Sequence, residues 1–333
     1  MSDGRESVTL HRFRSRVGRW RPRPLFLLSG VLVACAHHEP SPPRLAVSTQ
    51  GTSTRAEDAV LPYSYELEQA QPLQPPFLAR FERGPAHLLF VAAEHGCDPR
   101  TFRLIDDVLA AHHVGVVVVE GYPAAKGVNP QGYSRHLQEW AASGFCRGGG
   151  EGAYAASHGR ERGASFVGGE PDEKVVAQAV LEQGFTAEDL LGFYFVRQLP
   201  QLRREGALES NGLDASFHTL IEAMEQRAGL EGTAFSLDRF RDWYQRKQGK
   251  PFDAATLDDE EPAPIGSGRY FTQRISSVVG IVRDRFIVQR ISALLASDKD
   301  LLVVYGGSHF VTQRPAFEVL LGKAVELRPA DPP

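Results

Sequence analysis

The chain has 333 residues, of which 42% are hydrophobic and 23% are charged, and its formal net charge is -4. This balance is typical of a globular protein with one large core or two modest ones. The slight net acidity gives no support for nucleic-acid binding, so we predict no nucleic-acid partner.

Basic residues gather at the N-terminus, in RFRSRVGRWRPRP, and the apolar segment Leu25–Ala34 follows them. This segment is shorter than the stretch of about 20 apolar residues that spans a bilayer. The order of basic, apolar and small residues is that of a secretory signal. We therefore predict a signal peptide over 1–34; an uncleaved anchor is the alternative.

The end of this segment, LVAC, resembles the lipobox of bacterial lipoproteins. In that family the signal is cut before the cysteine, and the cysteine is acylated. The resemblance implies that acylated Cys35 anchors the mature chain to a lipid membrane. Cys35 is followed by Ala36 and not by an aspartate. By the same resemblance, this favours the outer membrane of a Gram-negative cell, with the protein facing the periplasm or the exterior.

Residues 35–80 are rich in Pro, Ser, Thr, Gln and Glu and show no hydrophobic periodicity. This composition is typical of a disordered tether, which a lipid-anchored domain needs as a spacer. We predict that residues 81–328 form a single α/β domain with a helical insertion over about 171–265.

Strands and helices alternate along this domain. The first strand, His87–Ala93, precedes a helix that Asp98 and Pro99 begin, and the unbroken apolar strand VGVVVVEGYP comes next. A strand, a helix and a strand within about 35 residues form a βαβ unit with parallel strands. GGGEGAYAASHGRERG is Gly-rich and predicts a surface loop.

The later elements follow the same alternation. ASFVGGEPDEK predicts a short third strand, and a long helix is expected over about 269–296. LLVVYGGSHF predicts the last clear strand, before a helix at Pro315–Leu321 and an edge strand at AVEL. The fold class is therefore α/β, with a mostly parallel central sheet, flanking helices and a helical insertion.

The four apolar strands end in residues that can bind a metal ion or exchange a proton. Glu94 and His95 follow the first strand, Glu120 ends the second, Glu170 ends the third, and His309 follows the last. Because ligands bind at the carboxyl ends of parallel strands, we expect these side chains to share one site. Taken singly, Glu120 is more often a surface group, and Glu170 can cap the following helix.

Two kinds of hydrolytic chemistry fit this set. His95, Glu120, Glu170 and His309 are ligand types that suit a divalent metal such as Mn, Zn or Co, which would activate a bound water. Without a metal, His95 and His309 act as general bases with the carboxylates. Glu94 orients His95 or activates water in either case.

The two remaining cysteines, Cys97 and Cys146, leave three alternatives. An exported chain meets an oxidising compartment, in which they can pair as a disulfide. Spacing alone does not establish a pair, so free thiols stay open. Cys97 lies three residues from Glu94, which leaves a soft metal ligand as the third alternative.

Five motifs carry a resemblance to a known superfamily: VAAEHG, VVVVEG, GGEP, RDRFIVQRI and VVYGGSHF, in this order over about residues 86–328. They are similar to motifs of the superfamily that joins TraB and GumN proteins, TIKI proteases, erythromycin esterases and ChaN haem-iron lipoproteins. The resemblance implies an erythromycin-esterase- or ChaN-like fold and a peptide or small ester substrate.

The same resemblance adds a residue to the site. Arg283 and Asp284 match the Arg followed by Asn or Asp that precedes the last strand in TraB and GumN relatives, which implies a catalytic Arg283 that clamps a carbonyl or an anion. From the residues alone, Arg283 is a surface charge on a helix.

The relatives differ in chemistry, which keeps three functions open. TIKI relatives resemble metal-dependent proteases, whereas erythromycin esterases resemble metal-free hydrolases. The AEHG motif is closer to the esterase and ChaN pattern. A ChaN-like protein would bind haem iron through His95 or His309 without catalysis, and an inactive scaffold is the third alternative.

Overall fold

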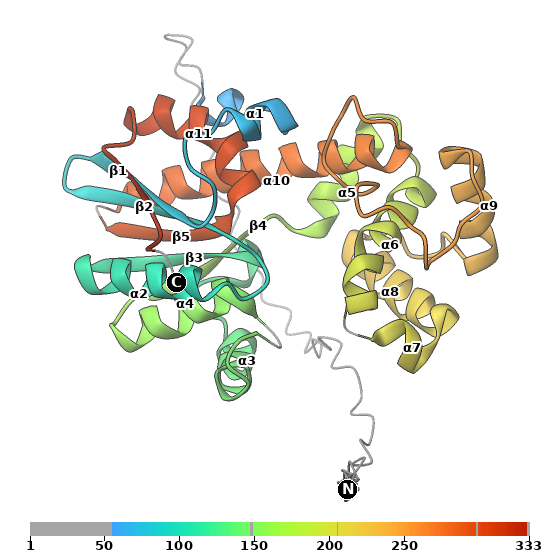
Figure 1. Cartoon of the computed structure of the whole chain (residues 1–333), viewed down its shortest axis with the longest axis horizontal. Helices are drawn as coiled ribbons and strands as arrows, with labels where there is room; N and C mark the ends of the chain where they lie inside the picture. The colour runs from blue at the N-terminus through green and yellow to red at the C-terminus, as the bar shows by residue number, and fades with distance from the viewer. Residues whose placement is uncertain (1–54, 147–148, 205, 298, 332–333) are drawn as a thin grey trace, which may run out of the picture. The chain divides into compact units, whose positions relative to one another are not determined.

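The computed structural model describes residues 55–331, apart from 147–148, 205 and 298 (Figure 1). The predicted signal peptide, Cys35 and the first part of the predicted tether lie outside the described residues. Among the described helices, none combines the length and apolar character that a membrane crossing needs.

The ordered domain begins earlier than predicted. The range 35–80 that we predicted as a tether contains η1 (Ala56–Ala59), α1 (Tyr65–Gln69) and the start of β1 (Phe77–Arg83). Val60 is 5% exposed and packs into the main core, and the N–H of Leu61 donates to the carbonyl of Thr312. These contacts fix a segment that has no periodicity of its own.

A six-stranded mixed sheet, in the order β4-β3-β5-β2-β1-β6, forms the centre of the domain. The parallel strands are β4 (Ser165–Glu170), β3 (Val114–Pro123), β5 (Asp300–Gly306) and β2 (Ala86–Ala93). β1 and β6 (Glu326–Pro329) add to one edge by antiparallel pairing. The predicted α/β class with a mostly parallel sheet is confirmed, while β1 was missed.

Helices cover both faces of the sheet, because side chains of a strand alternate between faces. Leu88, Phe90 and Ala92 of β2 pack with α10 (Phe271–Leu295) and α11 (Gly307–Leu321). The intervening residues of β2 face the opposite core. That second layer consists of α2 (Pro99–Ala111), α3 (Gln131–Ala142) and α4 (Gly150–Glu161), with η2 (Ala124–Lys126) after β3.

The surface loop predicted from the Gly-rich run is wrong, because most of the run forms α4. Ala153, Ala155 and Ala156 are fully buried, and a Cβ on Gly159 would lie 2.7 Å from Val117 Cγ2. The small residues therefore allow α4 to approach β3 closely. They were interpreted as turn residues because the same residue types serve both purposes.

The helical insertion has a core of its own. It consists of α5 (Glu173–Glu182), α6 (Ala187–Arg204), α7 (Ala207–Asn211), α8 (Leu213–Ala228) and α9 (Leu237–Gln248). Its buried residues include Phe195, Phe217, Phe240 and Trp243. α10 joins the two cores, since Val279 packs with the insertion and Ile287 packs against the sheet (Figure 1).

Candidate active site

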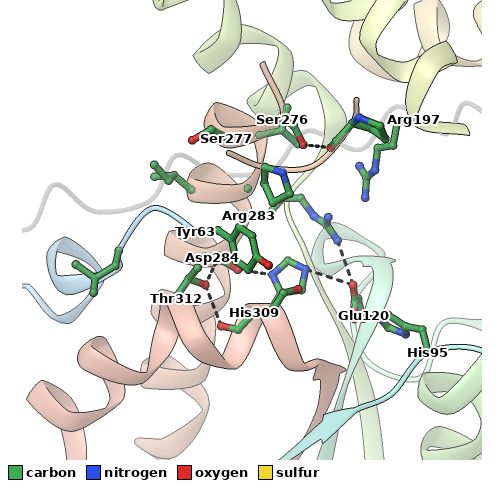
Figure 2. A pocket seen from close by; sticks show the side chains of 17 residues that line it. Tyr63, His95, Glu120, Arg197, Ser276, Ser277, Arg283, Asp284, His309 and Thr312 are labelled. Atoms are coloured by element: carbon green, nitrogen blue, oxygen red, sulfur yellow. Dashed lines mark hydrogen bonds and ion pairs between the residues drawn. The ribbon is translucent and has the colours of Figure 1, made fainter. Parts of the chain in front are cut away.

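Glu120 lies at the centre of a cluster at the carboxyl ends of the parallel strands. Its Oε1 is 3.4 Å from His309 Nε2, and its Oε2 is 3.8 Å from His95 Nε2. The N–H of Gly306 donates to the same carboxylate at 2.9 Å. Figure 2 shows Glu120 between the two imidazoles. The structure thus brings together the ends of β2, β3 and β5, as the sequence predicts.

Local backbone geometry places Glu120 in this position. β3 is irregular between Val119 and Pro123, where its register with β4 shifts. Gly121 adopts a φ of 74°, a conformation that residues with a Cβ rarely adopt. The glycine after Glu120 therefore permits the turn that leaves this carboxylate facing its neighbours across the strand ends.

His309 is held by a buried carboxylate on the neighbouring helix. Its Nδ1 lies 2.6 Å from Asp284 Oδ1. Thr312 Oγ1 and Gln313 Nε2 donate to Asp284 at 2.5 and 2.7 Å, and Asp284 is 4% exposed. Burial alone would lower the pKa of His309, but the charges of Asp284 and Glu120 outweigh it and raise the pKa to about 10. His309 is therefore an imidazolium at neutral pH.

Arg283 and Glu170 form a bidentate ion pair. Arg283 Nε and Nη2 donate to the two Glu170 oxygens, both at 2.6 Å. Tyr305 Oη also donates to Glu170, at 3.2 Å. A Cβ on Gly169 would lie 2.1 Å from that hydroxyl, which accounts for a glycine before Glu170. Burial raises the pKa of Glu170, and the stronger effect of Arg283 gives a net lowering.

His95 is the accessible member of the cluster, with 62% of its side chain exposed. Its Nδ1 lies 3.7 Å from Glu151 Oε2, and Glu151 is 8% exposed. The nearby carboxylate of Glu151 raises the pKa of His95 and outweighs the effect of desolvation, with a further contribution from Glu120. The sequence did not point to Glu151, because this residue lies in the run that was interpreted as a loop.

The structure shows no bond between Glu94 and His95, which the predicted orienting role would need. The side chain of Glu94 is exposed, lines neither pocket described below and makes no hydrogen bond or ion pair with the described residues. Glu151 instead provides the carboxylate beside His95 Nδ1.

Cys97 and Cys146 form a disulfide, which settles the three alternatives that the spacing left open. Cys97 follows His95 in the loop after β2, and Cys146 precedes α4, which carries Glu151. The bond therefore ties the segment of His95 to the segment of its carboxylate partner. Neither sulfur is available as a metal ligand.

Two pockets open onto the cluster, and His95 and Glu120 line both. The first has a volume of about 230 Å³ and is also lined by His309, Arg283 and Arg197. The second, of about 460 Å³, is lined by Tyr133 and Trp140 among others. A ligand that occupies both pockets would pass directly over Glu120 and His95.

The four side chains that we predicted as metal ligands are not grouped as a set of metal ligands in the structure. Both oxygens of Glu170 are bonded to Arg283, and Arg283 Nη2 lies 3.7 Å from Glu120 Oε1. A guanidinium at this distance competes with a metal cation for the same carboxylate. Over the described part of the chain, no three His, Cys, Asp or Glu side chains are arranged to hold a metal ion.

No family model, curated protein or solved structure matches this chain. The superfamily resemblance therefore stays a prediction. The chemistry of the cluster is compatible with proton transfer, because it presents an accessible imidazole and a buried imidazolium on either side of one carboxylate.

Proposed function

We propose that this chain is a hydrolase that cleaves an ester or peptide bond at the His95–Glu120–His309 cluster without a metal. The observation that supports this most directly is the contrast between the two imidazoles around Glu120. His95 is largely exposed and faces two pockets, whereas His309 is 15% exposed and bonded to Asp284. Imidazoles in contrasting environments suit different proton-transfer roles.

His95 serves as the general base in this mechanism. When its imidazole is neutral, it removes a proton from a water molecule as the water oxygen attacks the acyl carbon. The carboxylates of Glu120 and Glu151 stabilise the imidazolium that forms. His95 then returns the proton to the leaving alcohol or amine as the bond to the acyl carbon breaks.

His309 and Arg283 stabilise the negative charge that develops on the acyl oxygen. The distance of 3.4 Å between His309 Nε2 and Glu120 is long for a hydrogen bond, so the Nε2–H group can donate to a substrate oxygen. Arg283 Nη1 forms no hydrogen bond with the described residues, while Nε and Nη2 are held by Glu170. This assignment replaces the general-base role predicted for His309, since an imidazolium cannot accept a proton.

The export prediction has support of its own. The Cys97–Cys146 disulfide is of the kind that persists in oxidising compartments. With the lipobox resemblance at Cys35, we propose an acylated lipoprotein of the cell envelope, at the outer membrane. Metabolic labelling with a fatty acid tests this proposal, because the Cys35→Ser variant should lose the label.

The hydrolase proposal is tested with fluorogenic ester and peptide panels. We expect turnover by the purified protein, a loss of at least about 100-fold in the His95→Ala and His309→Ala variants, and no change in His218→Ala, an exposed histidine of the insertion. The absence of turnover on every ester and peptide would contradict the proposal.

Elemental analysis and an absorbance spectrum test the cofactor. We expect full activity after dialysis against a chelator. If the protein contains stoichiometric metal and both histidine variants lack it, the metal-free mechanism is contradicted and a metal-dependent one is supported. A Soret band without turnover would support the haem-binding alternative.

A further inference from the structure

The first pocket contains a guanidinium that the proposed mechanism does not use. Arg197 of α6 lines this pocket together with Arg283, and Figure 2 shows its guanidinium directed toward Arg283. Arg197 makes no hydrogen bond or ion pair with any described residue. Arg283, in contrast, is held by Glu170 through two hydrogen bonds. Only one of these two cations is therefore hydrogen-bonded to a carboxylate of the described residues.

The surroundings of Arg197 make this arrangement unfavourable in the absence of a ligand. Arg197 is exposed at the pocket, and desolvation and the charge of Arg283 lower its pKa by more than the nearby carboxylates of Glu170 and Glu173 raise it. An anion that enters the pocket would relieve this repulsion. A planar guanidinium matches a carboxylate in particular, because its two N–H groups can donate in parallel.

The rest of the pocket limits the size and character of the anionic group. The pocket volume is about 230 Å³, and Pro262, Pro264, Val279 and Ile281 contribute an apolar wall. His309 and Arg283, which stabilise the acyl oxygen in the proposed mechanism, line this pocket and not the second, so a group bound at Arg197 lies on the acyl side of the reacting centre. A leaving group then faces the second pocket, which Tyr133 and Trp140 line.

We infer that Arg197 binds a carboxylate on a short acyl chain of the substrate, so that the enzyme prefers acyl groups that end in a negative charge. This inference rests on the proposed function. It adds a residue that determines specificity without taking part in proton transfer.

Direct binding tests the inference without catalysis. Isothermal titration calorimetry is performed with glutaric acid monoamide, which carries one carboxylate, and with the neutral diamide. We expect the monoamide to bind the protein at least about 10-fold more tightly than the diamide, as a charge-assisted hydrogen bond implies. Arg197→Ala should remove this preference. Arg204→Ala, an exposed arginine of the same helix, should retain it.

Kinetics separate this inference from the proposed function. The substrates are the umbelliferyl half-ester of glutaric acid and its methyl ester, which differ only in charge. We expect kcat/KM for release of umbelliferone to be about 10-fold higher for the charged substrate. Arg197→Ala should remove this preference and still release umbelliferone from the neutral substrate. Equal kcat/KM values in both proteins would overturn the inference and leave the hydrolase intact. Charge-selective binding with no hydrolysis of any ester or peptide would overturn the proposed function instead.

Discussion

Asp284 and His309 lie on two different helices, and their side chains are 2.6 Å apart in a buried contact. Thr312 and Gln313 complete the surroundings of the same carboxylate. Asp284 is thereby fixed in one orientation, and it holds His309 with Nε2 toward Glu120. The geometry is that of a carboxylate that orients an imidazole and stabilises its protonated form.

The Asp284→Asn variant tests this relationship. The amide keeps the shape of the side chain but removes the charge that raises the pKa of His309 from its usual value to about 10. We expect kcat to fall about 100-fold or more and the pKa of His309 to decrease. NMR titration of the imidazole measures the pKa directly. An unchanged pKa in the variant would show that Asp284 does not control His309.

The pH dependence of kcat/KM should be bell-shaped. His95 must be neutral to accept a proton, and its pKa is raised, so activity should rise with pH through a midpoint above 6.5. His309 must be protonated to donate, so activity should fall as pH approaches about 10. In Glu151→Gln the rising limb should move to lower pH, because the carboxylate beside His95 is lost. A rising limb that does not move would exclude His95 as the base.

The disulfide should affect both stability and activity. Cys97 and Cys146 are 49 residues apart in the sequence. Closure of a loop of this length restricts the unfolded chain. The double variant in which Cys97 and Cys146 are both replaced by Ser should therefore lose about 4 kcal/mol of unfolding free energy. Activity should also decrease at temperatures where the variant is folded, because His95 and Glu151 lose their covalent tie. Urea unfolding and steady-state kinetics measure the two effects, and a variant with full activity would contradict the second.

Gly306→Ala should separate activity from stability. An added Cβ would lie 2.4 Å from His95 Nε2, the free end of an exposed side chain that can move away. Gly306 has a φ of -55°, which alanine adopts readily. We expect the unfolding free energy to change by less than about 1 kcal/mol and kcat/KM to fall at least about 10-fold. Gly132→Ala, where the added methyl contacts nothing within 4 Å, is the control.

Apolar runs with polar endings were sufficient to predict the strand ends of the cluster. His95 and His309 follow their strands, Glu120 lies near the end of β3 and Glu170 ends β4. These strands lie nearly where predicted, and parallel pairing brings their ends to one edge. Glu151 could not be found in this way, because α4, which carries it, is rich in glycine and alanine and was therefore predicted as a loop.

The remaining parts of the site depend on long-range packing. Asp284 entered only through the family resemblance, since nothing in a helical sequence indicates which polar residue will be buried against a neighbouring helix. The ion pair that occupies Glu170 joins residues 113 positions apart in the sequence. Arg197 belongs to the insertion, and its place in the first pocket depends on how α6 packs beside α10.

α10 spans 25 residues, which corresponds to a length of about 37 Å. Its first half is anchored in the core of the insertion, and its second half is anchored against the sheet. Arg283 and Asp284 lie between these anchors. Because α10 is packed at both ends, the positions of Arg283 and Asp284 depend on how the insertion and the sheet are placed along the same helix.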